Sequence, residues 1–326
     1  MKLFRKKNLL WMMVLLALAV LARRMGAVPA LAVAVMLAAA LGGLYLWQWA
    51  TAGRGVKRLA ALRERHGFDA MVTALRARHG NPEHARFVVL GDTRNNVPVA
   101  SEVYRQAAGE KPALVFHTGD IVRRGAAGEF LRNHVPLLGL VSPAPMFCVP
   151  GNHDQGARRD FNAFRALYGA DRFSFDFGDC RFTGFNNCAR ERVGSETLAW
   201  LDGELSKPGA RRRYVFMHIP PVYFEETFAG KDRRRGFKKN ADAFHALMRK
   251  HGVDEVFMAH IHGYATAVLD GVRYTLTAGG GAPLSRHLAE ANSVHNYVVL
   301  DVSPEGVRRF VARRRGDGAW ERQEEG

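Results

Sequence analysis

Hydrophobic and polar positions divide the chain into an apolar opening and a longer part in which short apolar runs alternate with polar turns. Two uncharged apolar runs, residues 9–22 and 27–50, lie on either side of Arg23 and Arg24. A helix needs roughly 20 apolar residues to cross a bilayer, so the second run is long enough and the first is marginal. We therefore expect a membrane anchor of one or two transmembrane helices over residues 1–52.

The orientation of this anchor depends on how many times it crosses. With two spans, the positive-inside rule places both termini in the cytoplasm, because the short connection carries only two positive charges. With a single span and the N-terminus inside, the large domain would face outward. A cleaved signal peptide is a competing interpretation, but the second apolar run argues against it. We favour two spans in an inner or plasma membrane, with the large domain on the cytoplasmic side.

Three further segments follow from the pattern after residue 52. Residues 53–84 predict an amphipathic helical linker that lies at the membrane surface or packs on the domain. Residues 85–315 predict a folded domain, and residues 316–326 a polar C-terminal tail. Within the domain, helical stretches such as residues 241–252 separate the short apolar runs, which indicates an α/β fold with parallel strands.

Five of these apolar runs end in a turn that carries polar residues. They read FVVLGDTRNN, ALVFHTGDIV, MFCVPGNHD, YVFMHIPP and VFMAHIHGY. Loops at the carboxyl ends of parallel strands meet at one edge of a sheet and form a natural site. The residues delivered there are Asp92, Asp120, Asn152, His153, His218, His260 and His262.

These side chains combine carboxylate and amide oxygens with imidazoles. Such a mixture suits Mn, Fe or Zn, and the absence of cysteine from the set argues against a structural zinc site. A shared carboxylate would let two ions lie ~3.5 to 4 Å apart, the spacing used to hold a phosphate and activate a water. Hydrolysis is therefore the chemistry that the pattern favours.

The amino-acid composition bears mainly on which molecules the protein binds. The chain of 326 residues is 48% hydrophobic and 24% charged, as in ordinary folded proteins, but its formal net charge is +16. An excess of this size suits phosphate compounds or lipid headgroups. Nucleic acid is the weaker alternative, since no recognisable nucleic-acid-binding module is present. The three cysteines match no zinc or disulfide framework, and the oligomeric state stays open.

The five motifs, taken together and in this order, resemble those of the calcineurin-like metallophosphoesterases. That family carries D-x-H, G-D-x-x, G-N-H-[DE], a later His and G-H-x-H. The matching positions are Asp92-Thr93-Arg94, Gly119-Asp120, Gly151-Asn152-His153-Asp154, His218 and His260-Ile261-His262. The resemblance covers residues 86–311 and implies two β-sheets packed face to face, with helices outside.

The resemblance also implies roles for these residues. Asp120 resembles the carboxylate that bridges two divalent ions. Asn152, His218 and His260 resemble ligands of one ion, and Asp92 and His262 resemble ligands of the other. His153 resembles the general acid that protonates the leaving oxygen, and Asp154 would orient it.

The first motif departs from the family, because Arg94 stands where a histidine is expected. A guanidinium has no lone pair to offer a metal. The second ion could survive on Asp92, Asp120, His262 and water while Arg94 binds phosphate as a bidentate clamp, which is the outcome we favour. Alternatively, the second ion binds weakly, or catalysis is lost.

The sequence therefore predicts a membrane-anchored, metal-dependent phosphoesterase with a dinuclear centre and a metal-bound hydroxide as nucleophile. The substrate would be a phosphorylated small molecule or a lipid-linked phosphate compound. The alternative is a membrane-tethered sensor that binds a phosphorylated ligand with little or no turnover.

Overall fold

The computed structural model describes residues 27–189, 192–223 and 236–325. Contacts within the chain divide it into two units, residues 1–54 and residues 55–326. Helix α2 (Ala27–His66) begins in the first unit and ends in the second. The second unit holds every strand of the structure's described residues and every residue expected in the site.

The structure does not support the predicted transmembrane anchor. Residues 9–22 lie outside the described residues, and residues 27–50 form the first part of α2. Among the helices that the structure describes, none is both long enough and apolar enough to cross a membrane. Helix α2 continues through the expected boundary at residue 52 to His66, while the two compact units meet at residues 54 and 55, and the boundary stays a prediction. The cytoplasmic location of the domain stays a prediction.

The segment expected as a linker packs on the domain. Helix α2 ends at His66, and α3 (Phe68–His79) begins two residues later. Leu59, Met71 and Leu75 are buried in the core of the second unit. Phe68 lies between the sheets' aromatic side chains, with its ring stacked on Phe173 at 5.8 Å. These apolar side chains of residues 55–79 therefore belong to the core of the second unit.

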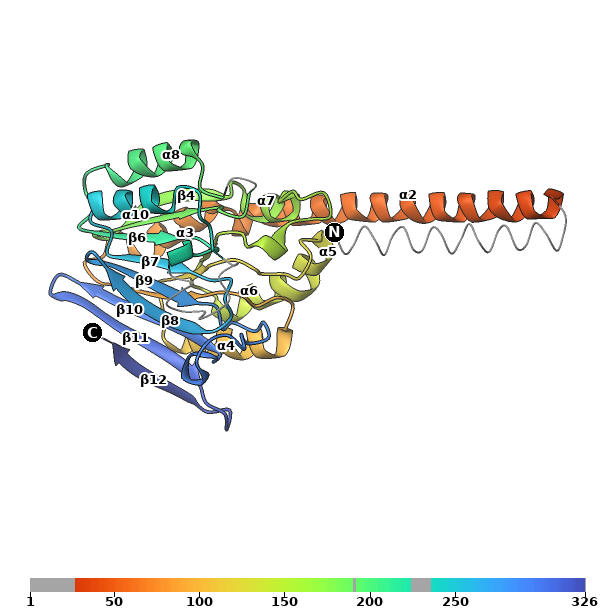
Figure 1. The fold of residues 1–326 in the computed structure, drawn as a ribbon. Helices are drawn as coiled ribbons and strands as arrows, with labels where there is room; N and C mark the ends of the chain where they lie inside the picture. The colour runs from red at the N-terminus through yellow and green to blue at the C-terminus, as the bar shows by residue number, and fades with distance from the viewer. Residues whose placement is uncertain (1–26, 190–191, 224–235, 326) are drawn as a thin grey trace. The chain divides into compact units, whose positions relative to one another are not determined.

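Two six-stranded mixed sheets form the centre of the second unit. Figure 1 shows their strands with helices outside them. The first sheet has the order β12-β11-β10-β1-β2-β3, and β1, β2 and β3 run parallel. Its strands are β1 (Ala85–Leu90), β2 (Leu114–His117), β3 (Met146–Cys148), β10 (Asn296–Ser303), β11 (Gly306–Arg314) and β12 (Trp320–Glu325).

The second sheet has the order β4-β5-β6-β7-β9-β8, with β5, β6, β7 and β9 parallel. Its strands are β4 (Arg172–Phe177), β5 (Cys180–Phe185), β6 (Arg212–Phe216), β7 (Glu255–Met258), β8 (Tyr264–Leu269) and β9 (Val272–Thr277). The expected α/β architecture of two packed sheets is confirmed. Both sheets are mixed, because β10 pairs antiparallel with β1 in the first sheet and the edge strands β4 and β8 pair antiparallel in the second.

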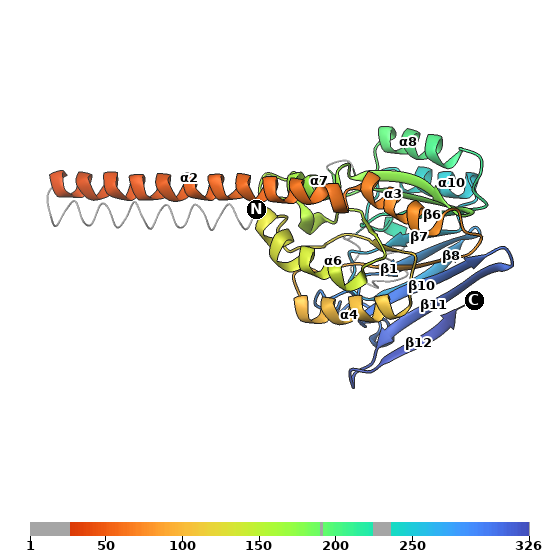
Figure 2. The ribbon, with the colours of Figure 1, turned by 180° about the vertical axis from the view of Figure 1, so that it is seen from behind.

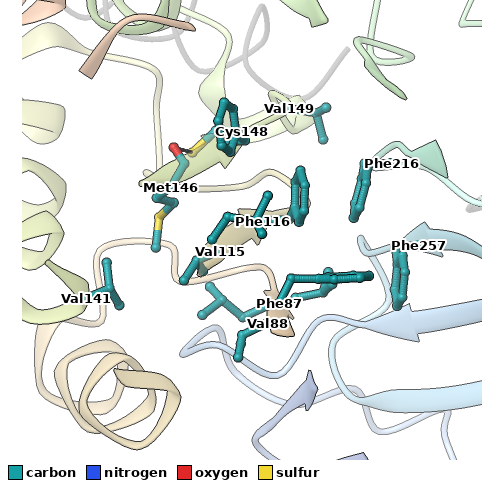
Figure 3. Close-up of a cluster of buried hydrophobic side chains, with 14 of the residues drawn as sticks. Phe87, Val88, Val115, Phe116, Val141, Met146, Cys148, Val149, Phe216 and Phe257 are labelled. Carbon is teal, nitrogen blue, oxygen red and sulfur yellow. Dashed lines mark hydrogen bonds between the residues drawn. The ribbon is translucent and has the colours of Figure 1, made fainter. Parts of the chain in front are cut away.

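Aromatic side chains fill the space between the two sheets (Figure 3). The ring of Phe116 on β2 stacks on that of Phe216 on β6, with 3.9 Å between centroids. Phe87 on β1 meets Phe257 on β7 edge-on at 6.5 Å. Rings of this size bury ~150 to 250 Å² each and so contribute heavily to the hydrophobic stabilisation. They fix the first sheet against the second along the strands that carry the site.

Helices cover the outer faces of both sheets (Figures 1 and 2). Helix α4 contacts β10 and packs against α6, while α8 contacts β5 and packs against α10. The remaining helical bounds are α4 (Val97–Gly109), α5 (Ala127–Glu129), the π-helical turn η1 (Phe130–His134), α6 (Val135–Val141), the 3₁₀ turns η2 (Asn152–Asp154) and η3 (Glu290–Asn292), α7 (Asn162–Tyr168), α8 (Ser195–Leu205) and α10 (Ala241–Lys250).

The end of the chain is a strand and not the polar tail that the sequence suggested. Strand β12 pairs with β11, and its last residue, Glu325, accepts hydrogen bonds from Tyr264 and the buried Arg309. Arg309 also donates to Glu255 on β7 at 3.1 Å, so this network joins the two sheets. The polar sequence of β12 lacks the alternation that predicts a half-buried strand, because β12 is an edge strand.

Candidate metal centre

The sequence-predicted site residues come from the carboxyl ends of neighbouring parallel strands. Asp92 follows β1, Asp120 follows β2 and Asn152 follows β3 in the first sheet. His218 follows β6 and His260 follows β7 in the second. Because the strand ends of both sheets carry them to one edge of the sandwich, residues distant in sequence come together there.

Several of these residues adopt an unusual backbone conformation. The φ angles of Asp92, Asp120 and His260 are 58°, 54° and 74°, and that of Arg94 is 44°. A non-glycine residue in this left-handed region costs on the order of 1 kcal/mol, and such residues cluster at functional sites. The strand ends therefore turn sharply so that their side chains face inward.

A close approach of two loops completes this arrangement. A Cβ atom on Gly119 would lie 2.6 Å from the Gly151 nitrogen, and one on Gly151 would lie 2.1 Å from the Asp120 nitrogen. The loops after β2 and β3 can therefore touch only because both positions are glycine. This contact brings Asp120 beside Asn152 and His153.

One set of ligands, which we name the Asp92 group, consists of Asp92, Asp120 and His262. Their ligand atoms all lie within 4.8 Å of one another. His262 Nδ1 is 2.6 Å from the carbonyl oxygen of Pro283, so it donates its proton there. In the neutral ring, Nε2 then directs a lone pair towards Asp92 Oδ1, 3.3 Å away. The buried Asp92 Oδ1 itself has no hydrogen-bond partner.

The second set, the Asn152 group, consists of Asp120, Asn152, His218 and His260. His218 Nδ1 lies 2.9 Å from the carbonyl oxygen of Thr118 and donates to it. Its Nε2 therefore faces Asn152 Oδ1 at 3.2 Å and Asp120 Oδ1 at 3.3 Å. The His260 ring lies edge-on to that of His218, with 5.2 Å between centroids.

In both groups, atoms that carry lone pairs face one another. Backbone carbonyls accept the Nδ1–H of His218 and of His262 and so fix the tautomer that leaves Nε2 available, as is usual for metal-ligating histidines. Oxygen atoms of carboxylates and an amide lie 3.2 to 3.3 Å from these nitrogens, which is hydrogen-bond distance. In this tautomer, however, both atoms of each pair are acceptors and neither carries a proton to donate. Carboxylate, amide and imidazole ligands converging in this way fit a divalent cation such as Mn²⁺, Fe²⁺ or Zn²⁺.

The electrostatics of the two carboxylates also fit a bound cation. Burial raises the pKa of Asp120, and the charge of the neighbouring Asp92 acts in the same direction. Burial also acts to raise the pKa of Asp92, but when the His262 ring is protonated its hydrogen bond and charge prevail and lower that pKa to about 2. Asp92 in turn raises the pKa of His262 against the effect of burial. A cation between these groups would supply the positive charge that the carboxylates lack.

Arg94 enters the site beside the Asp92 group. Its Nη1 lies 3.3 Å from His262 Nε2 and its Nε lies 3.8 Å from Asp120 Oδ2. Its Nη2 lies 2.8 Å from His153 Nε2, while His153 Nδ1 lies 2.9 Å from the carbonyl oxygen of Arg123. The guanidinium and the imidazole of His153 are therefore adjacent at the open side of the site.

Asp154 differs from the expectation that it orients His153. Its carboxylate accepts backbone N–H bonds from Gly151 at 2.8 Å, Val122 at 2.9 Å and Ile121 at 3.2 Å. These bonds join the loop after β2 to the loop after β3. The orientation of His153 comes instead from the Arg123 carbonyl, and Asp154 acts by holding the two ligand-bearing loops together.

Several supporting groups were not identified from the sequence. Asn187 is buried and accepts the backbone N–H groups of His218 and Ile219 at 3.1 and 3.0 Å, which positions the turn after β6. The carbonyls of Thr118 and Pro283 orient the two imidazoles. The Asn-Asn pair after β5 was the only available signal for Asn187, and nothing in a sequence reveals which carbonyl a histidine will meet.

Comparisons with known proteins agree with the geometry. The family model of the calcineurin-like phosphoesterases matches residues 85–264, more than half of the chain. A probable glycerophosphodiester phosphodiesterase GpdQ of Arcobacter nitrofigilis is 30% identical over 122 residues, which is 34% of this chain and 43% of that protein. The GpdQ of Enterobacter lignolyticus is 28% identical over 152 residues, or 43% and 52% of the two chains. The chain thus spans about half the length of these relatives.

Solved structures share the fold at low sequence identity. A purple acid phosphatase from yellow lupin superposes with a TM-score of 0.59 and 17% identity, covering 73% of this chain and 52% of that one. A dimetal phosphatase from Danio rerio superposes with a TM-score of 0.53 and 16% identity, covering 74% of this chain and 98% of that one. The family model, with the convergence of its motifs at one edge of the sandwich, establishes that the chain belongs to the calcineurin-like phosphoesterase family.

Proposed function

We propose that the chain is a metal-dependent hydrolase of phosphodiesters. One observation carries this proposal: buried carboxylates and imidazoles converge with their lone pairs facing one another, and Asp92 Oδ1 has no hydrogen-bond donor. The names of the curated relatives, which are glycerophosphodiester phosphodiesterases, support a diester as substrate.

Metal binding would be centred on Asp120, the carboxylate that the two groups share. A divalent ion held there would polarise a phosphoryl oxygen and make a water molecule more acidic. Mn²⁺ is our choice for testing, since oxygen and imidazole ligands suit it. The fixed tautomer of His218 means that the Asn152 group needs little rearrangement to receive an ion.

The remaining work would fall to His153 and Arg94. With Nδ1 held by the Arg123 carbonyl, His153 can direct Nε2 towards a leaving oxygen and deliver a proton to it. Arg94 offers a planar fork of N–H donors next to that ring, which suits two oxygens of one phosphoryl group. In the free protein the two side chains contact each other, and a bound phosphate would lie between them.

Turnover of aryl phosphates by the full chain tests the proposal. The metal-stripped chain with added Mn²⁺ should hydrolyse bis(p-nitrophenyl) phosphate faster than p-nitrophenyl phosphate. Glycerophosphoethanolamine should serve as a second diester substrate. Hydrolysis of the monoester alone would contradict the substrate class. Binding of phosphate without any turnover would contradict the enzyme and support the sensor that the sequence left as an alternative.

A further inference from the structure

We propose that the guanidinium of Arg94 takes the place of a second metal ion, so that each chain binds a single divalent ion, in the Asn152 group. This inference departs from the two ions expected from the sequence. It rests on the proposed function for its setting, and it specifies what occupies each half of the centre.

The contacts of Arg94 lie within the Asp92 group. Its Nη1 approaches His262 Nε2 at 3.3 Å, and its Nε approaches Asp120 Oδ2 at 3.8 Å. A guanidinium carries only donors, so an N–H aimed at Nε2 uses the lone pair that a metal would need. Two of the three members of the Asp92 group are therefore in contact with a positive charge that belongs to the chain.

The backbone directs Arg94 into the centre. Its φ angle is 44°, and its N–H donates to the carbonyl oxygen of Asp120 at 3.0 Å. Only 20% of its side chain is exposed. Its Nη2 bonds His153 at 2.8 Å, so the guanidinium is held from both sides. An arginine that served only to attract substrate from solvent would need none of these restraints.

Charge separates the two halves of the centre. Asp92 and Asp120 are negative, and Arg94 remains positive at any physiological pH. A single divalent ion together with Arg94 already exceeds the charge of the two carboxylates. A second ion would meet the guanidinium within a few ångströms in a largely buried site, where repulsion is poorly screened. In the Asn152 group, by contrast, the atoms that face His218 Nε2 are the oxygens of Asn152 and Asp120.

Metal stoichiometry tests this assignment without reference to catalysis. The full chain is stripped with a chelator, titrated with Mn²⁺ by calorimetry and analysed for metal after equilibrium dialysis. We expect one Mn²⁺ per chain. Arg94→His restores an imidazole at the position and should raise the content to two. Arg94→Lys keeps the positive charge and should remain at one, which makes it the matched control.

Two results would overturn the assignment. One is an unaltered chain that binds two Mn²⁺ ions with similar affinity, and the other is an Arg94→His variant, folded by circular dichroism, that still binds only one. If Arg94→His fails to fold, Arg94→Gln gives the same decision, because removing the charge should admit a second ion of lower affinity. A stoichiometry of one without any phosphodiester turnover would sustain this assignment and refute only the proposed function.

Discussion

The Asn152 group and the Asp92 group share Asp120 but differ in what faces their imidazoles. In the Asn152 group, His218 Nε2 faces the oxygens of Asn152 and Asp120 at 3.2 and 3.3 Å, all of them ligand atoms. In the Asp92 group, His262 Nε2 faces Asp92 but also a nitrogen of Arg94 at 3.3 Å. The replacement of a histidine by Arg94 therefore distinguishes the two groups. The Asn152 group presents only ligand atoms, whereas the Asp92 group is already in contact with a positive charge.

Loss of the shared carboxylate should have the largest effect, since it removes a ligand from both groups. We expect Asp120→Asn to lower kcat by at least about 10³-fold, which is roughly 4 kcal/mol of barrier. The asparagine oxygen can still accept the His153 N–H that Asp120 accepts at 2.8 Å, so the loop should keep its shape. Steady-state rates with excess Mn²⁺ measure the loss. Activity within tenfold of the unaltered chain would rule out a shared metal ligand at this position.

A matched pair of substitutions separates the two groups. His218→Gln should weaken Mn²⁺ binding by more than about 100-fold, because even outer partners of metal ligands contribute 10- to 100-fold to affinity. His262→Gln should change Mn²⁺ affinity by less than about tenfold, since Arg94 and not an ion contacts that imidazole. Calorimetric titration gives both affinities. The comparison fails if the two variants lose affinity equally.

The role of His153 predicts a dependence on the leaving group. A general acid contributes about 10² to 10⁴-fold where the leaving oxygen needs a proton. His153→Gln should therefore slow the release of an alkoxide leaving group by about 10²-fold or more, and that of p-nitrophenolate by less than about tenfold. The kcat/KM values for a series of diesters whose leaving groups range from p-nitrophenolate to an alkoxide report this difference. A uniform loss across the series would assign His153 to phosphate binding alone.

The smallest expected effect concerns the free energy of unfolding and the contribution of His117, which lies next to the Asp92 group. His117 is buried, its Nδ1 accepts the Gly119 N–H at 3.1 Å, and its Nε2 lies 3.3 Å from Thr93 Oγ1. Burial lowers the pKa of His117 from 6.5 to about 3. Below about pH 6.5 the unfolded chain therefore binds a proton at His117 that the folded chain does not bind. The free energy of unfolding decreases as the pH falls from about 6.5 towards 3.

His117→Gln isolates this contribution, because glutamine does not titrate. Between pH 7 and pH 5, the unaltered metal-free chain should lose about 2 kcal/mol more of its free energy of unfolding than the variant does. Burial also lowers the pKa of His134, but that effect is present in both proteins and cancels. Urea unfolding at the two pH values measures the difference. Parallel curves for the two proteins would show that His117 is protonated in the folded state.

The sequence predicted the centre better than it predicted the ends of the chain. The five apolar runs with polar turns identified seven converging residues, because strand period and turn chemistry are local properties. The polar strand β12 and the packing of α3 depend on tertiary contacts with β11 and with Phe147, which leave no local pattern. The same holds for Asp154, whose three bonds go to backbone groups.

Arg94 shows most clearly where sequence reasoning ended. The sequence shows that Arg94 replaces the expected histidine, and from this we predicted a second ion held by fewer ligands. The direction of the guanidinium could not be foreseen, because it depends on a positive φ angle and on two imidazoles from other strands. Only the assembled site shows that the arginine meets His262 and not solvent.

An anomalous-scattering map of the full chain crystallised with Mn²⁺ would test the central claim most directly. We predict one strong peak enclosed by Asp120, Asn152 and His218, and the guanidinium of Arg94 beside His262 where a second peak would otherwise lie. A map with Mn²⁺ bound elsewhere, and no peak against Asp120, would contradict the metal centre itself.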